Sequence, residues 1–243
     1  QVGFITNLKK ILAAGEKRAL LISATGTGKT YASAFAMREL GFRRVLFLVH
    51  RGQLARQTRK SYEKVFANTV SMGLVGAGYH EYEADYVFAT VQTLNRDEHL
   101  LQYAKDAFDC IVLDEAHHVP ADTYQKVMKH FTPKLWLGMT ATPDKRDDNI
   151  EGRNVYEIFN YQIAYEIRLQ QAMEENLLCP FHYFGITDLS MIGDEEAARD
   201  FNMLTSDERV RHIVNQADYY GYSGDKVKGL IFCSNIKETE ELS

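Results

Sequence analysis

The stretch ISATGTGKTY, residues 22–31, places two glycines, a lysine and a threonine directly behind a short apolar run. The run ALLI (19–22) predicts a buried strand, and KTYASAFAMREL (29–40) has the alanine and leucine content of a helix. The glycines therefore belong to a strand-to-helix turn. Backbone N–H groups and the positive end of the helix dipole favour a polyphosphate there, so the turn predicts a phosphate-binding loop.

Side chains in this turn have the chemistry that a nucleoside triphosphate requires. Lys29 can reach the β- and γ-phosphates, and the Thr30 hydroxyl can coordinate Mg²⁺. The consensus GxxxxGK[ST] has glycine where this chain has Ser23, so SATGTGKT is a variant P-loop. The loop residues predicted to bind the nucleotide are Thr25, Gly26, Thr27, Gly28, Lys29 and Thr30.

A second apolar run ends in carboxylates, in the stretch DCIVLDEAHH (109–118). If this run ends at the carboxyl edge of a sheet, Asp114 would hold Mg²⁺ through water and Glu115 would polarise the attacking water. The predicted catalytic residues are therefore Lys29, Asp114 and Glu115. The predicted Mg²⁺ ligands are Thr30 and Asp114.

Short apolar runs recur between segments of helical periodicity. Besides residues 19–22, the runs predicted to be buried strands are VLFLV (45–49), YVFA (86–89), CIVL (110–113) and LWLGM (135–139). This alternation indicates an α/β fold with a parallel sheet and helices on both faces. Ligands bind such sheets at the carboxyl ends of the strands, where the glycines and the carboxylates are expected.

The last third of the chain has a different pattern. Helical periodicity runs from Tyr161 to Leu178, and two further strands are predicted at 180–186 (PFHYFGI) and 229–233 (GLIFC), before a helical tail, KETEEL. These strands are too few for a complete α/β domain. The predicted boundaries are 1–160 for the ATP-binding domain, 161–179 for a connecting helical segment and 180–243 for the truncated start of a second domain.

Composition indicates a folded cytoplasmic protein. The 243 residues are 45% hydrophobic with a formal charge of −5, so any basic surface must be local. Neither a membrane-spanning run of about 18 apolar residues nor a secretory signal is found. Cys110, Cys179 and Cys233 lack metal-binding spacing and adjoin apolar stretches, so reduced core thiols are expected. Because the chain starts at Gln1 and not at Met, we expect it to be a piece of a longer protein.

Three ordered motifs, GTGKT (26–30), DEAH (114–117) and GMTATP (138–143), resemble those of superfamily 2 helicases and translocases. The chain is most similar to the branch shared by type III restriction-enzyme translocating subunits and nucleotide-excision-repair helicases. The resemblance implies two RecA-like domains, with ATP and Mg²⁺ in the cleft between them and nucleic acid across the top. It favours DNA as the track, and RNA stays open because DEAH also occurs in RNA helicases.

The resemblance assigns roles to further residues. His117, Thr140 and Thr142 are similar to residues that couple the ATP state to strand movement, and Gln1 stands near the place of an adenine-reading glutamine. Three stretches resemble nucleic-acid-contacting motifs: VLFLVHRGQLARQT (45–58), ATVQTL (89–94) and IFCSNI (231–236). Their candidate contact residues are His50, Arg51, Thr90, Gln92, Thr93, Ser234 and Asn235.

The resemblance also implies parts that this sequence does not match. The family carries arginine fingers in a motif of the form QxxGRxxR, which has no counterpart here. An arginine finger contributes ~10³-fold or more to the rate, so we expect the chain to bind ATP but to hydrolyse it slowly. The implied partners are nucleic acid, the remainder of the second RecA-like domain and a fused or associated nuclease.

A basic segment stands out in this acidic chain. Between Gly41 and Tyr62 there is no Asp or Glu, and the cations are Arg43, Arg44, Arg51, Arg56, Arg59 and Lys60. Arg51 directly follows a predicted strand at the edge of the ATP motifs, which favours a phosphate contact. Arg56, Arg59 and Lys60 suit a solvated helix face equally well, and Thr90, Gln92 and Thr93 suit ordinary capping of a strand end.

Two functions from other classes are open alternatives. A P-loop switch or small-molecule kinase would need a substrate lid or a guanine-reading NKxD motif, and the sequence has neither. A nucleic-acid-binding module that does not hydrolyse ATP would not need Lys29, Asp114 and Glu115, all of which are intact.

Overall fold

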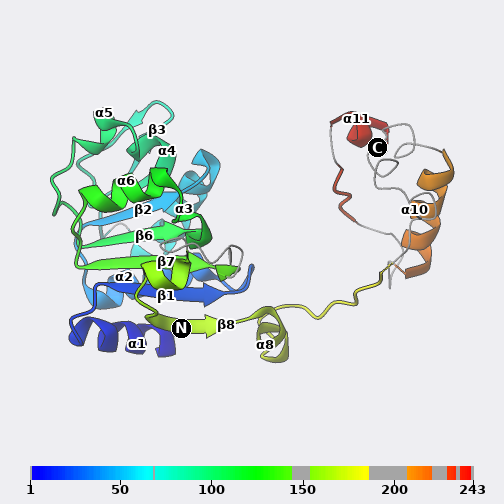
Figure 1. Cartoon of the computed structure of the whole chain (residues 1–243), viewed down its shortest axis with the longest axis horizontal. Helices are drawn as coiled ribbons and strands as arrows, with labels where there is room; N and C mark the ends of the chain where they lie inside the picture. The colour runs from blue at the N-terminus through cyan, green and yellow to red at the C-terminus, as the bar shows by residue number, and fades with distance from the viewer. Residues whose placement is uncertain are drawn as a thin grey trace. The chain divides into compact units, whose positions relative to one another are not determined.

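The computed structural model describes residues 2–67, 69–143, 154–185, 207–220, 229–233 and 236–241. The chain divides into two compact units, Gln1–Cys179 and Pro180–Ser243. The first unit contains one sheet covered by helices (Figure 1). In the described part of the second unit, the regular secondary structure is helical only. The division leaves the assignment of residues 180–243 to a second RecA-like domain as a prediction.

The sheet of the first unit has eight strands in the order β4-β3-β5-β2-β6-β7-β1-β8. All neighbouring strands are parallel except β3 and β4. The strands are β1 (Arg18–Ser23), β2 (Val45–Val49), β3 (Met72–Gly76), β4 (Tyr79–His80), β5 (Tyr86–Thr90), β6 (Cys110–Asp114), β7 (Leu135–Thr140) and β8 (Ile163–Ile167). All five strands predicted from apolar runs are present, so the predicted α/β fold with a parallel sheet is confirmed.

Helices pack on both faces of this sheet because consecutive side chains of a strand point to opposite sides. Phe47 of β2 belongs to one core and Leu46 to the other. The helices of the first core are α1 (Val2–Ala13), α2 (Lys29–Leu40) and α3 (Gly52–Phe66). Those of the second core are α4 (Val91–Leu94), α5 (Asp97–Leu100), α6 (Asp122–His130) and α7 (Val155–Ile158).

Gly138 in the middle of β7 permits close packing in the second core. A Cβ at this position would lie 2.6 Å from Phe159 Cζ and 2.8 Å from Leu20 Cδ2. We therefore expect Gly138→Ala to lower the free energy of unfolding of the first unit by about 1–3 kcal/mol, as overpacking of a core does. Urea unfolding followed by the fluorescence of Trp136, the single tryptophan, measures this change.

A matched control is Gly52→Ala in α3, where an added Cβ meets no atom within 4 Å. This variant should unfold at the urea concentration of the original chain or slightly above it. Equal stability of the two variants would contradict the packing argument.

The predicted helical segment from Tyr161 to Leu178 is wrong over its first half. Residues 163–167 form β8, which pairs with β1 at the sheet edge, and only Leu169–Glu174 form a helix, α8. Within β8 only Ala164 and Ile167 are buried, a spacing of three residues that imitates a helical period. As an edge strand that pairs with one neighbour, β8 thus shows no clear alternation of buried and exposed residues.

Two predicted strands in the second unit are also wrong. The described residues 180–185 and 229–233 have no regular secondary structure, since none of the described residues of this unit pairs with them as a strand. A single extended segment leaves its backbone groups without ladder partners. The described helices here are α10 (Asp207–Tyr220) and α11 (Ile236–Glu241), and α11 contains most of the predicted helical tail.

The three cysteines are free and differ in burial. Cys110 lies buried in β6 as expected, whereas Cys179 is exposed and Cys233 is half-buried, so the expectation of three core thiols is wrong. Cys179 is the last residue of the first unit. Among the helices that the structure describes, none has the length and hydrophobicity to cross a bilayer.

Candidate functional site

The predicted site residues gather at the carboxyl edge of the sheet. The segments that follow β1, β2, β5, β6 and β7 begin at this edge, because the five strands are parallel and in register. They carry Thr25 to Thr30, His50 and Arg51, Thr90 to Thr93, Asp114 to His117, and Thr140 to Thr142. Predicted residues that lie outside the described residues are Gln1, Ser234 and Asn235.

The phosphate loop between β1 and α2 is held open by two left-handed glycines. Gly26 has φ 88° and Gly28, directly before α2, has φ 86°. The Ser23 and Thr27 hydroxyls are 2.5 Å apart, and Thr27 donates to the Ala24 carbonyl at 2.7 Å. Ser23 can therefore donate to Thr27 and brace the loop, a role that the glycine of the consensus could not perform.

Lys29 begins α2 and turns back toward the loop. Its Nζ donates to the carbonyl oxygens of Ser23 at 3.0 Å and Ala24 at 3.4 Å. Burial lowers the pKa of Lys29, and the nearby carboxylates of Glu115 and Asp114 oppose this shift. Lys29 and the acidic pair after β6 therefore lie close enough to interact electrostatically, and their joint role in binding a nucleotide stays a prediction.

The acidic pair carries electrostatic and conformational strain. Burial raises the pKa of Asp114, and the like charge of Glu115 raises it further, while Lys29 and His50 act in the other direction. Glu115 has φ 51° and ψ 51°, a left-handed conformation that costs a non-glycine residue about 1–3 kcal/mol and clusters at functional sites.

The donor set of this site fits a hard divalent cation. Oxygen ligands from a carboxylate and a hydroxyl suit Mg²⁺, and the two adjacent like charges are the kind of repulsion that a cation relieves. Asp114 provides the carboxylate, and Thr30 lies half-buried in the first turn of α2. The structure contributes this agreement of donor chemistry, and the metal role of both residues stays a prediction.

A chain of polar contacts joins the ends of β6 and β7. Glu115 Oε2 lies 3.3 Å from His117 Nδ1, which lies 3.1 Å from Thr140 Oγ1. The Thr142 backbone N–H donates to the same Thr140 oxygen at 3.1 Å. His117 is 7% exposed and Thr140 is fully buried, so this chain is largely protected from water. These contacts connect Glu115 to His117, Thr140 and Thr142, the three residues predicted to couple the ATP state to strand movement.

The predicted nucleic-acid residues differ in how far their groups are engaged. Arg51 is exposed directly before α3, and His50 is half-buried with its Nδ1 buried and without a hydrogen-bond partner. Thr90 Oγ1 lies 2.9 Å from Thr93 Oγ1 and accepts from the Thr93 backbone N–H. The Thr90 hydroxyl therefore caps α4, and the Thr93 hydroxyl is bonded to it. Contact of both residues with nucleic acid stays a prediction, as does that of the exposed Gln92.

The basic segment also divides into two groups. Arg59 is paired with Glu63 at 3.1 Å and with Glu81 at 3.6 Å, which fits a structural role. Arg51 and Arg56 are exposed at the amino-terminal end of α3, which begins at the carboxyl edge of the sheet. Counter-charge for a phosphate backbone is therefore expected from these two arginines.

Two neighbours of the site were missed from sequence. Leu178 packs over the phosphate loop, since a Cβ on Gly26 would lie 3.1 Å from its Cδ2. The hairpin of β3 and β4 lies beside Thr90 and Thr93. Its only sequence signal was the glycine pair in GAGY (76–79), which is typical of a tight turn.

The first part of the chain, which contains the phosphate loop and the acidic pair, has relatives among known proteins. Residues 1–145 match the family described as "Type III restriction enzyme, res subunit". The chain belongs to this family. It is 26% identical over 273 residues to the type I restriction enzyme EcoAI endonuclease subunit of Escherichia coli, a match that covers 100% of this chain and 33% of that protein.

Two solved structures share the fold of this res-subunit family member. The nuclease-deletion mutant of the type ISP restriction-modification enzyme LlaGI has a TM-score of 0.54 at 19% identity, covering 89% of this chain and 22% of that one. The Pyrococcus furiosus Hef helicase domain has a TM-score of 0.51 at 22% identity, covering 65% and 36%. The predicted RecA-like fold and the predicted membership of the restriction-enzyme branch of superfamily 2 are confirmed.

Proposed function

We propose that this chain is the ATP-binding part of a motor that moves along DNA. The observation that carries the proposal is the meeting of Lys29, Asp114 and Glu115 at one carboxyl edge of the sheet. The family to which the chain belongs supports a helicase-like motor. In the full-length protein, ATP hydrolysis would drive closure and opening of the cleft between two RecA-like domains.

Each residue of the site has a role in this proposal. Thr30 and Asp114 would hold Mg²⁺, which when bound would neutralise charge on the β- and γ-phosphates. Lys29 would exchange its two carbonyl partners for phosphate oxygens, which are stronger acceptors for an ammonium group. Glu115 would orient the attacking water and accept its proton. His117 contacts both Glu115 and Thr140, so it would transmit the change in charge at Glu115 to Thr140.

DNA is the proposed track because a relative that the whole chain matches and a structural neighbour are both named as restriction enzymes. The EcoAI subunit is named as part of a restriction enzyme, and the LlaGI structure contains a DNA substrate mimic. Arg51 and Arg56 would contact the phosphate backbone, which DNA and RNA share. RNA is therefore the alternative that an experiment must address directly.

The chain of 243 residues is expected to bind ATP in preference to GTP and to hydrolyse it slowly. Without arginine fingers its turnover should be about 10³-fold below that of the full-length protein. Competition of ATP and GTP against a fluorescent ATP analogue measures the preference, and phosphate release measures turnover. GTP selectivity would favour a switch, and fast nucleic-acid-stimulated turnover by the chain alone would contradict the second expectation.

The track is tested with the full-length protein. Its ATPase rate should rise with duplex DNA and should rise less with an RNA of the same sequence. Stimulation by RNA alone would replace DNA with RNA in the proposal. ATP binding without any turnover in the full-length protein would favour a nucleic-acid-binding module that does not hydrolyse ATP.

A further inference from the structure

A small pocket lies at the carboxyl edge of β3 and β5, beside the predicted nucleic-acid residues. It has a volume of about 160 Å³, and its lining includes Gly52, Arg56, Gly76, Tyr79, Thr90 and Thr93. Sites for free ligands usually measure about 300–1,000 Å³. The pocket is therefore better suited to one group of a bound polymer than to a separate small molecule.

The groups that line the pocket favour an anion. Arg56 supplies a guanidinium, and Gly52 is the first residue of the 15-residue helix α3, whose positive end lies there. Thr90 and Thr93 add two hydroxyls that are bonded to each other, which leaves one hydroxyl hydrogen for a ligand. No carboxylate is among the lining residues, and the rest of the lining is apolar: Ala55, Leu74, Val75 and Ala77. A phosphodiester group matches this set in charge and in hydrogen-bonding capacity.

The β3–β4 hairpin forms one wall of the pocket and is held tightly against α4. Its turn has three consecutive residues with positive φ: Gly76 at 103°, Ala77 at 52° and Gly78 at 87°. A Cβ at Gly76 would lie 2.5 Å from Thr93 Oγ1, so only glycine allows this approach. The hairpin therefore presents Tyr79, its next residue, at a defined place on the pocket lining.

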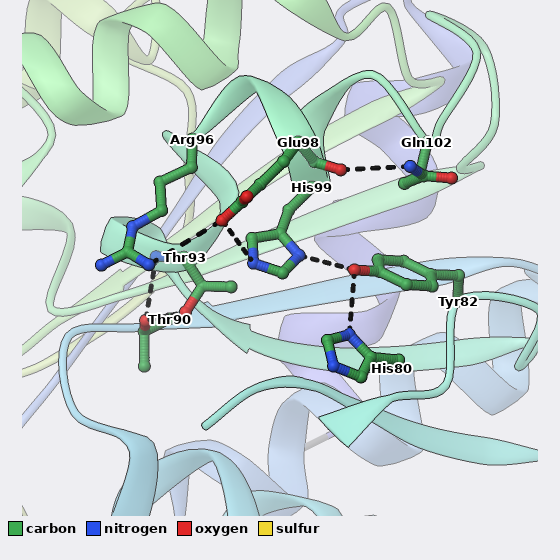
Figure 2. A network of polar contacts seen from close by, with 8 residues as sticks. All are labelled: His80, Tyr82, Thr90, Thr93, Arg96, Glu98, His99 and Gln102. Atoms are coloured by element: carbon green, nitrogen blue, oxygen red, sulfur yellow. Dashed lines mark hydrogen bonds and ion pairs between the residues drawn. The ribbon is translucent and has the colours of Figure 1, made fainter. Parts of the chain in front are cut away.

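A second set of contacts fixes the outer side of the hairpin, as Figure 2 shows. The Tyr82 hydroxyl lies 3.3 Å from His80 Nδ1 and 2.6 Å from Nδ1 of the buried His99 in α5. His99 Nε2 lies 3.5 Å from Glu98 Oε1. His80 is thus tied through Tyr82 to α5, while its neighbour Tyr79 is left 41% exposed. The anchored hairpin therefore leaves the ring of Tyr79 partly accessible for contact.

We propose that Tyr79 stacks on an unpaired base of a bound single strand, next to the nucleotide whose phosphate occupies the pocket beside Arg56. This inference rests on the proposed function, since it names a contact within the same nucleic-acid surface. Every base has a face on which an aromatic ring can stack, so such a contact is independent of sequence. Because the hairpin already fixes the backbone of Tyr79, only the side-chain torsions of Tyr79 need to be ordered on binding.

Fluorescence anisotropy of the chain with two labelled single-stranded DNA oligonucleotides tests the proposal. One oligonucleotide is oligo-dT, and the other has the same length with abasic sugars throughout. Tyr79→Ala should weaken binding to oligo-dT by about 5- to 100-fold and leave binding to the abasic strand within about twofold of the original chain. Tyr79→Phe should bind both strands as the original chain does.

Two further variants make the result specific. Tyr79→Leu keeps an apolar wall without an aromatic ring and should lose as much affinity for oligo-dT as Tyr79→Ala. Tyr161→Ala removes a tyrosine that is 65% exposed before β8, at the amino end of the sheet, and should bind both strands unchanged.

Each alternative result has a distinct meaning. Unchanged binding of Tyr79→Ala to oligo-dT, or an equal loss on both strands, would overturn the stacking role and leave Tyr79 as a wall of the pocket. Failure of the original chain to bind either strand while it still binds ATP would overturn the stacking role together with the nucleic-acid part of the proposed function.

Discussion

Replacing Glu115 with glutamine is expected to leave ATP affinity intact and to reduce turnover in the full-length protein by about 10²- to 10⁴-fold. Glutamine has the shape of glutamate and can still contact His117, but it cannot accept the proton of the attacking water. The substitution also removes the like charge that raises the pKa of Asp114, so nothing in the change opposes nucleotide binding. Phosphate release at saturating ATP measures turnover, and a fluorescent ATP analogue measures affinity.

The control for this variant is Glu39→Gln in the last turn of α2. Glu39 is exposed and has only a 3.7 Å pair with Arg38, so its loss should leave both turnover and ATP affinity unchanged. If Glu115→Gln hydrolyses ATP at the original rate, Glu115 is not the base, and the hydrolytic role of the acidic pair is wrong.

The placement of the candidate ATP-site residues at one edge of the sheet could be predicted because the motifs that carry them are local in sequence. The loop of residues 24–28, five residues between β1 and α2, holds Gly26 and Gly28 and leads into Lys29, and a buried strand delivers Asp114 and Glu115 to the same edge. A parallel sheet brings those two segments together whatever the loops between them do. The sequence could not show how Ser23 stabilises the loop in place of the consensus glycine, because that role depends on its hydrogen bond to Thr27.

The edges of the sheet were harder to predict than its centre. Central strands are buried on both faces and read as continuous apolar runs, whereas β3 and β4 contain glycines and exposed residues. Their assignment depends on tertiary contacts, such as Gly76 against Thr93. For the same reason Tyr79 could not be selected from the 14 tyrosines of the chain before the hairpin was known.

The contact between Leu178 and the phosphate loop shows a different limit of sequence analysis. Leu178 packs with Ala24 and Ile167, and its backbone N–H donates to the Ala172 carbonyl at the end of α8. The segment was predicted to be one connecting helix, yet β8 and the turn after α8 are what bring Leu178 back over the loop. The contact of Leu178 with the loop depends on the pairing of β8 with β1, which the hydrophobic periodicity of the sequence did not reveal.

The second large effect is expected from Lys29→Met, which should weaken ATP binding by about 10- to 150-fold. Hydrogen bonds to charged groups contribute about 1.5–3 kcal/mol, and the Lys29 ammonium, which now donates to the Ser23 carbonyl, would donate to phosphate oxygens in the proposed complex. Methionine keeps the unbranched stem in its half-buried place, so the loss is one of charge and not of packing. Titration of the fluorescent ATP analogue measures the affinity, and urea unfolding followed by Trp136 fluorescence verifies the fold.

The matched control is Lys17→Met, at the amino end of the same strand that leads into the loop. Lys17 is exposed, and β1 separates it from the site, so ATP affinity should not change. Lys29→Met should also lose the distinction between ATP and ADP, because the ammonium is placed for the terminal phosphates whereas the loop N–H groups contact the inner ones. Original ATP affinity in Lys29→Met would mean that the triphosphate binds elsewhere, and Asp114 and Glu115 would then have no substrate beside them.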